Sequence, residues 1–178
     1  MFYLHRHPIK TQKLDAEQFF QRYQLGERNF SRVDINCASL SDLNLADINL
    51  WQANLAKTNL GSTALQKANL EQVNLQGANL WRADLTKASL VNAQCSQALL
   101  IRANCKQANL YKAQLEGAEM RLACLAGANL QGADLTGANL SYADLSSANL
   151  MGANLTHTIF TGANLGQANL SQTNLDEA

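Results

Sequence analysis

Few residues of this 178-residue sequence have the types that metal binding or nucleophilic catalysis requires. The histidines are His5, His7 and His157, and no cysteine or carboxylate lies near the His5-x-His7 pair to complete a metal site. No phosphate-binding loop, GxSxG motif or HExxH motif is present. The sequence therefore predicts a protein that is not an enzyme and that has no cofactor and no metal.

The cysteines show neither the CxxC spacing of a zinc site nor a disulfide framework. We interpret them as reduced, small hydrophobic residues of a cytosolic protein. The four positions are Cys37, Cys95, Cys105 and Cys124.

Fourteen Lys and Arg balance fourteen Asp and Glu, so no net field attracts nucleic acid or acidic lipid. The first residues carry charge where a secretory signal needs an apolar run. No stretch of eighteen apolar residues could cross a membrane. A cytoplasmic protein without membrane association is expected.

An internal repeat of five residues dominates the chain. Every fifth residue from Phe30 to Leu175 is the centre of a unit, and twenty-four of these thirty centres are Leu. Two residues before the centre lies Ala in twenty-one units, and immediately before it lies Asn or Asp in twenty-one. The thirty units follow one another without an insertion or deletion.

A period of five fits neither a helix nor a straight strand. On a helix the leucines would spread around the whole surface, and on a strand they would alternate between its two faces. All of them are buried only if the chain turns through a right angle after each unit, so that four units close a coil of twenty residues. Residues 28–178 then form a four-sided β-solenoid of about 7.5 coils.

Glycines recur two residues after the centre, as in Gly77 and Gly132. A type II turn needs a positive φ at one position, which glycine adopts at the least cost. The glycines therefore predict type II turns at the corners of the coil.

The Ala-(Asn/Asp)-Leu-x-x pattern, as in Ala128-Asn129-Leu130 and Ala133-Asp134-Leu135, resembles that of the pentapeptide-repeat family. The resemblance covers residues 28–178 and implies the right-handed quadrilateral β-helix of that family. It also implies a role in protein-protein contacts, because some relatives act as regulators in this way.

Residues 1–27 do not follow the repeat. Residues 14–25 are predicted to form a helix with Ala16, Phe19, Phe20 and Tyr23 on one side, ended by Gly26. We interpret this segment as a cap over the first coil, with a partner-binding helix as the alternative. A helix followed by Gly-Glu-Arg-Asn-Phe is similar to the start of the repeat in cyanobacterial members of the family.

The repeat runs to Leu175, and no residues remain for a second cap. The last coil is therefore predicted to leave its edge open and to expose a layer of leucines. We expect end-to-end dimerisation through this layer. Its residues are Leu165, Leu170 and Leu175.

The outward positions carry whatever is particular to this protein. Since a coil has twenty residues, positions twenty apart lie on the same side of the solenoid. One side is predicted to bind a protein partner, because it combines apolar residues with arginines. Its centres are residues 40, 60, 80, 100, 120, 140 and 160. We call it the Trp81 face. Its candidate residues are Trp81, Arg82, Leu99, Ile101, Arg102, Arg121, Leu122, Tyr142 and Ile159. The opposite side carries Trp51, Val91, Tyr111 and Met151 among more polar neighbours.

Charge is uneven along the chain. Residues 48–121 hold eight Lys or Arg against four acids, and residues 122–178 hold four acids and no base. The resembling family includes quinolone-resistance proteins that mimic acidic DNA and bind gyrase, a role that the basic middle disfavours. Direct nucleic-acid binding is not expected either, because the lysines fall on different faces. The sequence thus favours a rigid scaffold or regulatory interaction module, with a DNA-mimicking modulator of gyrase as the alternative.

Overall fold

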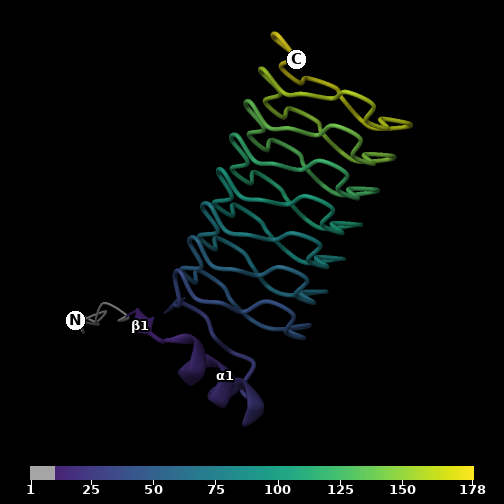
Figure 1. Cartoon of the computed structure of the whole chain (residues 1–178). Coiled ribbons are helices and arrows are strands. Elements are labelled where there is room, and N and C mark those ends of the chain that lie inside the picture. Colours follow the sequence, from purple (N-terminus) through teal and green to yellow (C-terminus); the bar gives the residue numbers. More distant parts are fainter. Residues whose placement is uncertain (1–10) are drawn as a thin grey trace, which may run out of the picture.

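The computed structural model describes residues 11–178, which form a stack of coils closed at the N-terminal end by a helix (Figure 1). The regular elements are strand β1 (Gln12–Lys13), helix α1 (Ala16–Gln24) and strand β2 (Val33–Asp34). The remaining coils consist of single-residue β-bridges joined by turns. The histidines His5 and His7 lie outside the described residues.

Parallel bridges join each residue before a centre to its equivalent twenty residues later, from Asn29↔Asn49 to Asn154↔Asn174. The Leu80 N–H donates to the Leu99 carbonyl at 2.8 Å, whereas the Asn79 N–H donates to the Thr58 carbonyl of the preceding coil at 2.9 Å. Each coil is therefore bonded to both of its neighbours. The predicted coil of four five-residue sides is confirmed.

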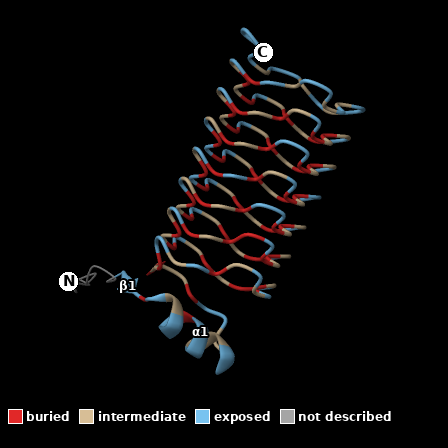
Figure 2. Cartoon of the chain, in the orientation of Figure 1, coloured by how far each residue is buried: buried red, intermediate tan, exposed pale blue. Residues whose placement is uncertain are grey.

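The core is a set of leucine columns flanked by small residues. In Figure 2 the buried positions, drawn in red, recur in successive coils along the stack. All centres from Phe30 to Leu155 are buried. Where a buried Thr takes the small position, at Thr58, Thr63 and Thr158, its hydroxyl donates to a carbonyl of the preceding coil, as from Thr63 to Leu40 at 2.9 Å. A buried hydroxyl is thus accommodated without an unsatisfied polar group.

Each corner is a β-turn that starts at a centre, as shown by the Ala83 N–H donating to the Leu80 carbonyl at 3.0 Å. Within residues 28–178, φ is positive at the second residue after every centre and at no other position. This confirms the predicted type II turns. Twenty-three of these residues are not glycine, and a left-handed conformation costs such a residue about 1–2 kcal/mol. None of the thirty residues at this second turn position is β-branched.

The Asn or Asp before a centre supports the turn after it. The Asn79 Oδ1 accepts a hydrogen bond of 3.0 Å from the Trp81 N–H, inside the turn. The Asn79 amide also donates to the Asn59 Oδ1 of the preceding coil at 3.0 Å. This residue type is repeated because it satisfies a turn N–H and links coils at the same time.

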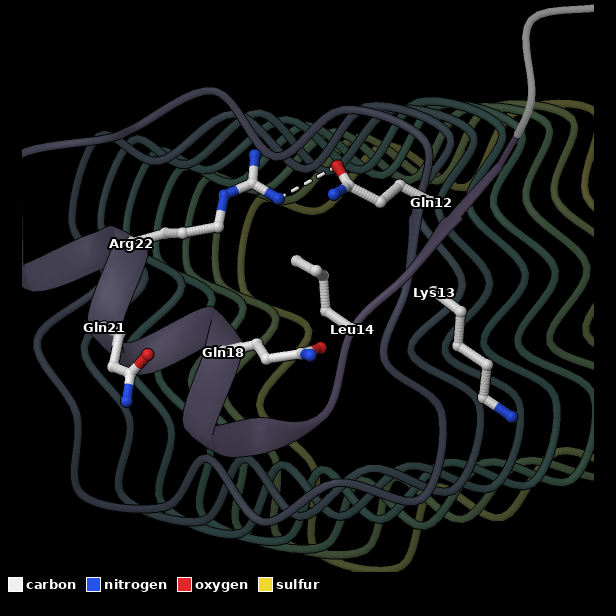
Figure 3. A pocket seen from close by; sticks show the side chains of 6 residues that line it. All are labelled: Gln12, Lys13, Leu14, Gln18, Gln21 and Arg22. Carbon is white, nitrogen blue, oxygen red and sulfur yellow. Dashed lines mark hydrogen bonds between the residues drawn. The ribbon is translucent and has the colours of Figure 1, made fainter.

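Helix α1 confirms the helix predicted over residues 14–25. It starts with a capping box, in which the Gln18 N–H donates to the Asp15 Oδ1 at 2.8 Å and the Asp15 N–H to the Gln18 Oε1 at 3.1 Å. Strand β1 pairs in parallel with β2 and so adds one rung below the first coil. Figure 3 shows α1 and β1 crossing the end of the solenoid, with Leu14 between them.

Phe19 is fully buried, and its ring centroid lies 4.4 Å from that of Phe30 in the first coil. The expectation that Phe20 shares this side is wrong, since Phe20 is 40% exposed. Consecutive helical residues point about 100° apart, so only one of the two rings can face the coil. Helix α1 therefore covers the core with one phenylalanine and exposes the other.

At the other end, Leu165 and Leu170 are partly buried and Leu175 is 50% exposed. Within the described residues, the N–H groups of the last four centres have no backbone acceptor. The carbonyls of the last four small positions likewise have no backbone donor. The N–H groups belong to Phe160, Leu165, Leu170 and Leu175, and the carbonyls to Thr158, Ala163, Ala168 and Thr173. Within the described residues, the last coil therefore has unpaired backbone donors and acceptors along its outer edge.

Candidate interaction surface

The Trp81 face holds most of the large apolar side chains that the described residues expose. Eight such side chains are exposed, and the five that belong to the coils before the last leucine layer all lie on this face. They are Trp81 (42%), Leu99 (41%), Leu122 (48%), Tyr142 (63%) and Ile159 (48%). The other three are Phe20 and Leu25 in the cap and Leu175 in the last coil. Scattered exposure is ordinary for single residues, but exposure confined to one face marks a surface.

Stacking of the turns brings the predicted residues together. The Arg82 N–H donates to the Ile101 carbonyl at 3.1 Å, and the Arg102 N–H donates to the Arg121 carbonyl at 3.0 Å. Successive turns are therefore in direct contact along the rod. Leu99 continues the same surface, because it pairs with Asn79 and Glu119 on the adjacent coils.

The three arginines of this face differ in their partners. The Arg82 guanidinium lies 5.1 Å from the centroid of the Trp81 ring, a cation–π arrangement. The Arg121 Nε forms an ion pair of 3.2 Å with the Glu119 carboxylate. Arg102 forms no ion pair with any described residue. Arg102 is therefore free to bind an external anion, and Arg82 contacts the Trp81 ring rather than a carboxylate.

A hollow of about 240 Å³ lies beside Trp81, and sequence reasoning missed it. It arises at Gly61, which occupies the first turn position that Trp81 fills in the next coil. Gly61 has no positive φ, so the turn does not require a glycine here. A glycine without a conformational reason was the signal available in the sequence. The hollow is lined by Ser41, Asp42, Asn59, Gly61, Ser62, Asn79 and Trp81.

The large residues of the opposite side are better covered. Trp51, Val91, Tyr111 and Met151 are all only partly exposed. The Arg32 guanidinium lies 4.5 Å from the Trp51 ring, and the Lys112 ammonium lies 5.3 Å from the Tyr111 ring. Because none of these four residues is as exposed as Trp81, this side has less free apolar surface than the Trp81 face.

The expected dispersal of the lysines over different faces is wrong for three of them. Lys67, Lys87 and Lys106 all belong to the side with centres Leu45, Leu65, Leu85 and Cys105, which we call the Lys87 face. The Lys87 N–H donates to the Lys106 carbonyl at 3.0 Å, so these lysines are in adjacent turns. Lys57 and Lys112 lie on the two other sides.

All four cysteines are free, and the two at centre positions are buried as predicted. Burial raises the pKa of both the Cys95 and the Cys105 thiol to about 12. Since the thiolate is the reactive form, these two side chains are poor nucleophiles near neutral pH. The other two cysteines are not in the core: Cys37 is exposed in a turn, and Cys124 is partly exposed in the outward position before a centre.

The cap contains a second hollow, of about 310 Å³, between β1 and α1 (Figure 3). Its one arginine, Arg22, is already engaged by Gln12 at 2.9 Å and by the Glu27 carboxylate at 2.7 Å. The hydrogen bond from Arg22 holds the pKa of Glu27 below its ordinary value. The remaining lining consists of Lys13, Leu14, Gln18 and Gln21.

Nowhere in residues 11–178 do three His, Cys, Asp or Glu side chains gather as metal ligands. In the same range, no helix has both the length and the apolar character needed to cross a membrane.

The sequence matches the family described as pentapeptide repeats over residues 34–72, 53–90, 88–127, 125–156 and 148–178. The chain therefore belongs to the pentapeptide-repeat family, and its solenoid is the right-handed quadrilateral β-helix of that family. No curated protein matches the chain.

Solved structures of other pentapeptide-repeat proteins resemble the chain. Trypsin-treated QnrB1, a plasmid-mediated fluoroquinolone resistance protein, has a TM-score of 0.75 at 16% identity, covering 85% of this chain and 80% of its own. HetL from the cyanobacterium Nostoc sp. strain PCC 7120, involved in heterocyst differentiation regulation, is 28% identical over 90% of this chain and 96% of its own, with a TM-score of 0.37. Rfr23 from the cyanobacterium Cyanothece 51142 is 26% identical over 86% and 95%, with a TM-score of 0.34.

Proposed function

We propose that the protein is a non-catalytic, rigid interaction module that binds a protein partner through the Trp81 face. The observation that carries this proposal is that, before the last leucine layer, all exposed large apolar side chains of the coils lie on that one face. Trp, Tyr and Arg are the residue types enriched where binding energy concentrates in interfaces. The solenoid holds them at fixed spacing, so little conformational entropy is lost on binding.

Trp81 and the hollow at Gly61 form the expected anchor of this surface. Trp81 offers a half-exposed indole, and the neighbouring hollow has room for a side chain of the partner. A buried aromatic contact next to a filled hollow is the usual composition of a binding hot spot. Leu99, Ile101 and Leu122 extend the contact along the rod.

Truncation of Trp81 tests this proposal. We expect Trp81→Ala to weaken binding of the partner at least about tenfold, which corresponds to the loss of one hot-spot side chain. Arg102→Glu should weaken it as well, because Arg102 is free to bind an external anion. The measurement is quantitative affinity capture from an extract of the organism that makes the protein, followed by titration of the captured partner.

Trp51→Ala is the matched control, since Trp51 occupies the same turn position on the opposite side. Its partner binding should equal that of the wild type. Equal losses for the two tryptophan variants, or no loss for Trp81→Ala, would contradict a binding role for the Trp81 face.

The gyrase-directed alternative receives no support from the surface. The likeness to QnrB1, at 16% identity, concerns the fold. A mimic of DNA needs a dense array of negative charge, whereas the middle of this rod exposes Lys67, Lys87 and Lys106 on one face.

We also propose that the open last coil of this chain pairs with the same coil of a second copy. Each side of that coil offers N–H donors at its centre and at its second turn position and one carbonyl acceptor at its small position, so donors of one copy can pair with acceptors of another across a twofold axis. The leucine layer of Leu165, Leu170 and Leu175 would be buried at the same time. Sedimentation equilibrium should give a dimer mass for the wild type and a monomer mass for Leu170→Asp. A monomer mass for the wild type at every concentration would contradict this pairing.

A further inference from the structure

The Trp81 face and the Lys87 face are consecutive sides of each coil and share a corner. Trp81 and Arg82 form the turn between Leu80 and Ala83, and Ala83 opens the next side. The apolar patch and the row of lysines therefore border one another along the rod. The two surfaces can contact the same partner.

Five cations surround the Lys87 face over three successive coils. Arg82 and Arg102 are exposed in the turns that lead into this side. Lys67, Lys87 and Lys106 are exposed in the turns that lead out of it. None of the five forms an ion pair with another residue in the described part of the chain. Their charges are therefore available to an external partner.

The strip between the two rows of cations carries small side chains. The outward positions of successive coils are Ala64, Asp84, Asn104 and Cys124. A partner segment can therefore approach the backbone here while its sides meet the cations of the flanking turns.

Asp84 is the one acid on this strip between the cations. Burial tends to raise the pKa of the Asp84 carboxyl, but hydrogen bonds from Thr86 and Gln66 outweigh burial, so its pKa lies below the ordinary value. Its oxygens accept from the Thr86 hydroxyl at 2.6 Å and from the Gln66 amide at 2.6 Å. Asp84 is thus ionised, and its oxygens are engaged by Thr86 and Gln66. The five cations and this one carboxylate together carry a net charge of +4.

We propose that the partner presents an acidic, amphipathic segment that lies along this corner, with its apolar side on the Trp81 face and its carboxylates on the Lys87 face. This inference rests on the proposed function and specifies the chemistry of the partner. Charge complementarity supports carboxylates, and continuity with Leu99, Ile101 and Leu122 supports a segment that also carries apolar side chains. A nucleic acid would use the cations but would leave the leucine and isoleucine side chains exposed.

The test uses a labelled synthetic peptide of about 18 residues, which as a helix of five turns spans about 27 Å. It carries Leu at positions i, i+3, i+4 and i+7 of each pair of turns and Glu elsewhere, and its neutral counterpart carries Gln in place of Glu. Fluorescence anisotropy with the full chain should show binding of the Glu peptide that weakens as ionic strength rises. The Gln peptide should bind at least about tenfold more weakly.

A matched pair of double variants places the binding site. Lys67→Glu/Lys87→Glu should weaken binding of the Glu peptide by about tenfold. Lys57→Glu/Lys112→Glu should leave it within about twofold, because these lysines lie on other sides. All four lysines occupy the second turn position with φ between 53° and 59°, so both variants alter the same turn position on different faces.

Equal losses in both double variants, absence of Glu-peptide binding, or tighter binding of duplex DNA that Lys67→Glu/Lys87→Glu abolishes would each overturn the inference. These outcomes are separable from failure of the proposed function. If Trp81→Ala lowers partner capture while the peptide does not bind, the Trp81 face stands as the interaction surface and the acidic segment is rejected.

Discussion

Leu85→Asp is expected to unfold the middle of the solenoid. Leu85 is fully buried in a column of leucine centres, with a centre of the preceding coil on one side and one of the following coil on the other. A carboxylate there would lose its hydration without gaining a partner, which costs at least about 4 kcal/mol. Because each coil of a solenoid is stabilised only by its neighbours, the loss should separate the rod into two weakly coupled halves. Urea unfolding followed by circular dichroism measures the change.

Leu122→Asp is the control for this substitution. Leu122 is 48% exposed in a turn position with a φ of +59°, a conformation that Asp adopts more readily than Leu. Its free energy of unfolding should stay within about 0.5 kcal/mol of the wild type. Comparable losses at the two positions would contradict the assignment of centre residues to the core.

The loss caused by Leu85→Asp should depend on pH. Burial raises the pKa of an introduced carboxyl in the folded state above its unfolded value, so the folded protein prefers the neutral form. The destabilisation should therefore be largest above the folded-state pKa and should shrink as the pH falls toward the unfolded value near 4. A loss that is independent of pH would indicate a cavity effect alone.

Phe19→Ala is expected to open the N-terminal end of the rod. Phe19 is fully buried and packs on Phe30 in the first coil, so its truncation removes the main apolar contact between α1 and the solenoid. Phenylalanine truncation in a core costs about 3–5 kcal/mol. The effect should remain local, because coils interact with nearest neighbours only. Amide hydrogen exchange should accelerate in residues 28–47 and stay unchanged in residues 128–147.

Phe20→Ala is the matched control, since the two phenylalanines are adjacent in α1 but Phe20 is 40% exposed. Its exchange pattern should match that of the wild type. The alternative interpretation of α1 as a partner-binding helix predicts a different result, in which Phe20→Ala lowers partner binding and Phe19→Ala leaves the first coil protected.

The sequence is sufficient for the fold because one period of five residues repeats from Phe30 to Leu175 without interruption. Burying every centre allows only one geometry, and that geometry also places residues twenty apart in contact. The grouping of the Trp81-face residues on one side could be predicted from the same twenty-residue period. The conformation of the turns was harder to predict from the sequence, because glycine is the only residue that signals a positive φ. Twenty-three of the turns have another residue at that position.

Other features depend on side-chain packing that periodicity does not determine. The choice between Phe19 and Phe20 depends on how α1 is rotated over the first coil. The hollow at Gly61 depends on what its neighbours in adjacent coils leave unfilled. The exposure of Cys37 follows from its place in a turn rather than from its residue type. Lys67, Lys87 and Lys106 form a row because they occupy neighbouring turns on the same side of successive coils. The number of charges in the segment does not show this arrangement.

Site-specific photo-crosslinking in the organism that makes the protein tests the central claim most directly. A benzophenone amino acid replaces Leu99 on the Trp81 face, or Gln94 or Gln114 on the side with centres Cys95 and Leu115; all three positions precede a centre and are exposed. We expect a discrete protein adduct from Leu99 and none from Gln94 or Gln114. The same adduct from all three positions, or an adduct from Gln94 and Gln114 alone, would contradict a binding role for the Trp81 face.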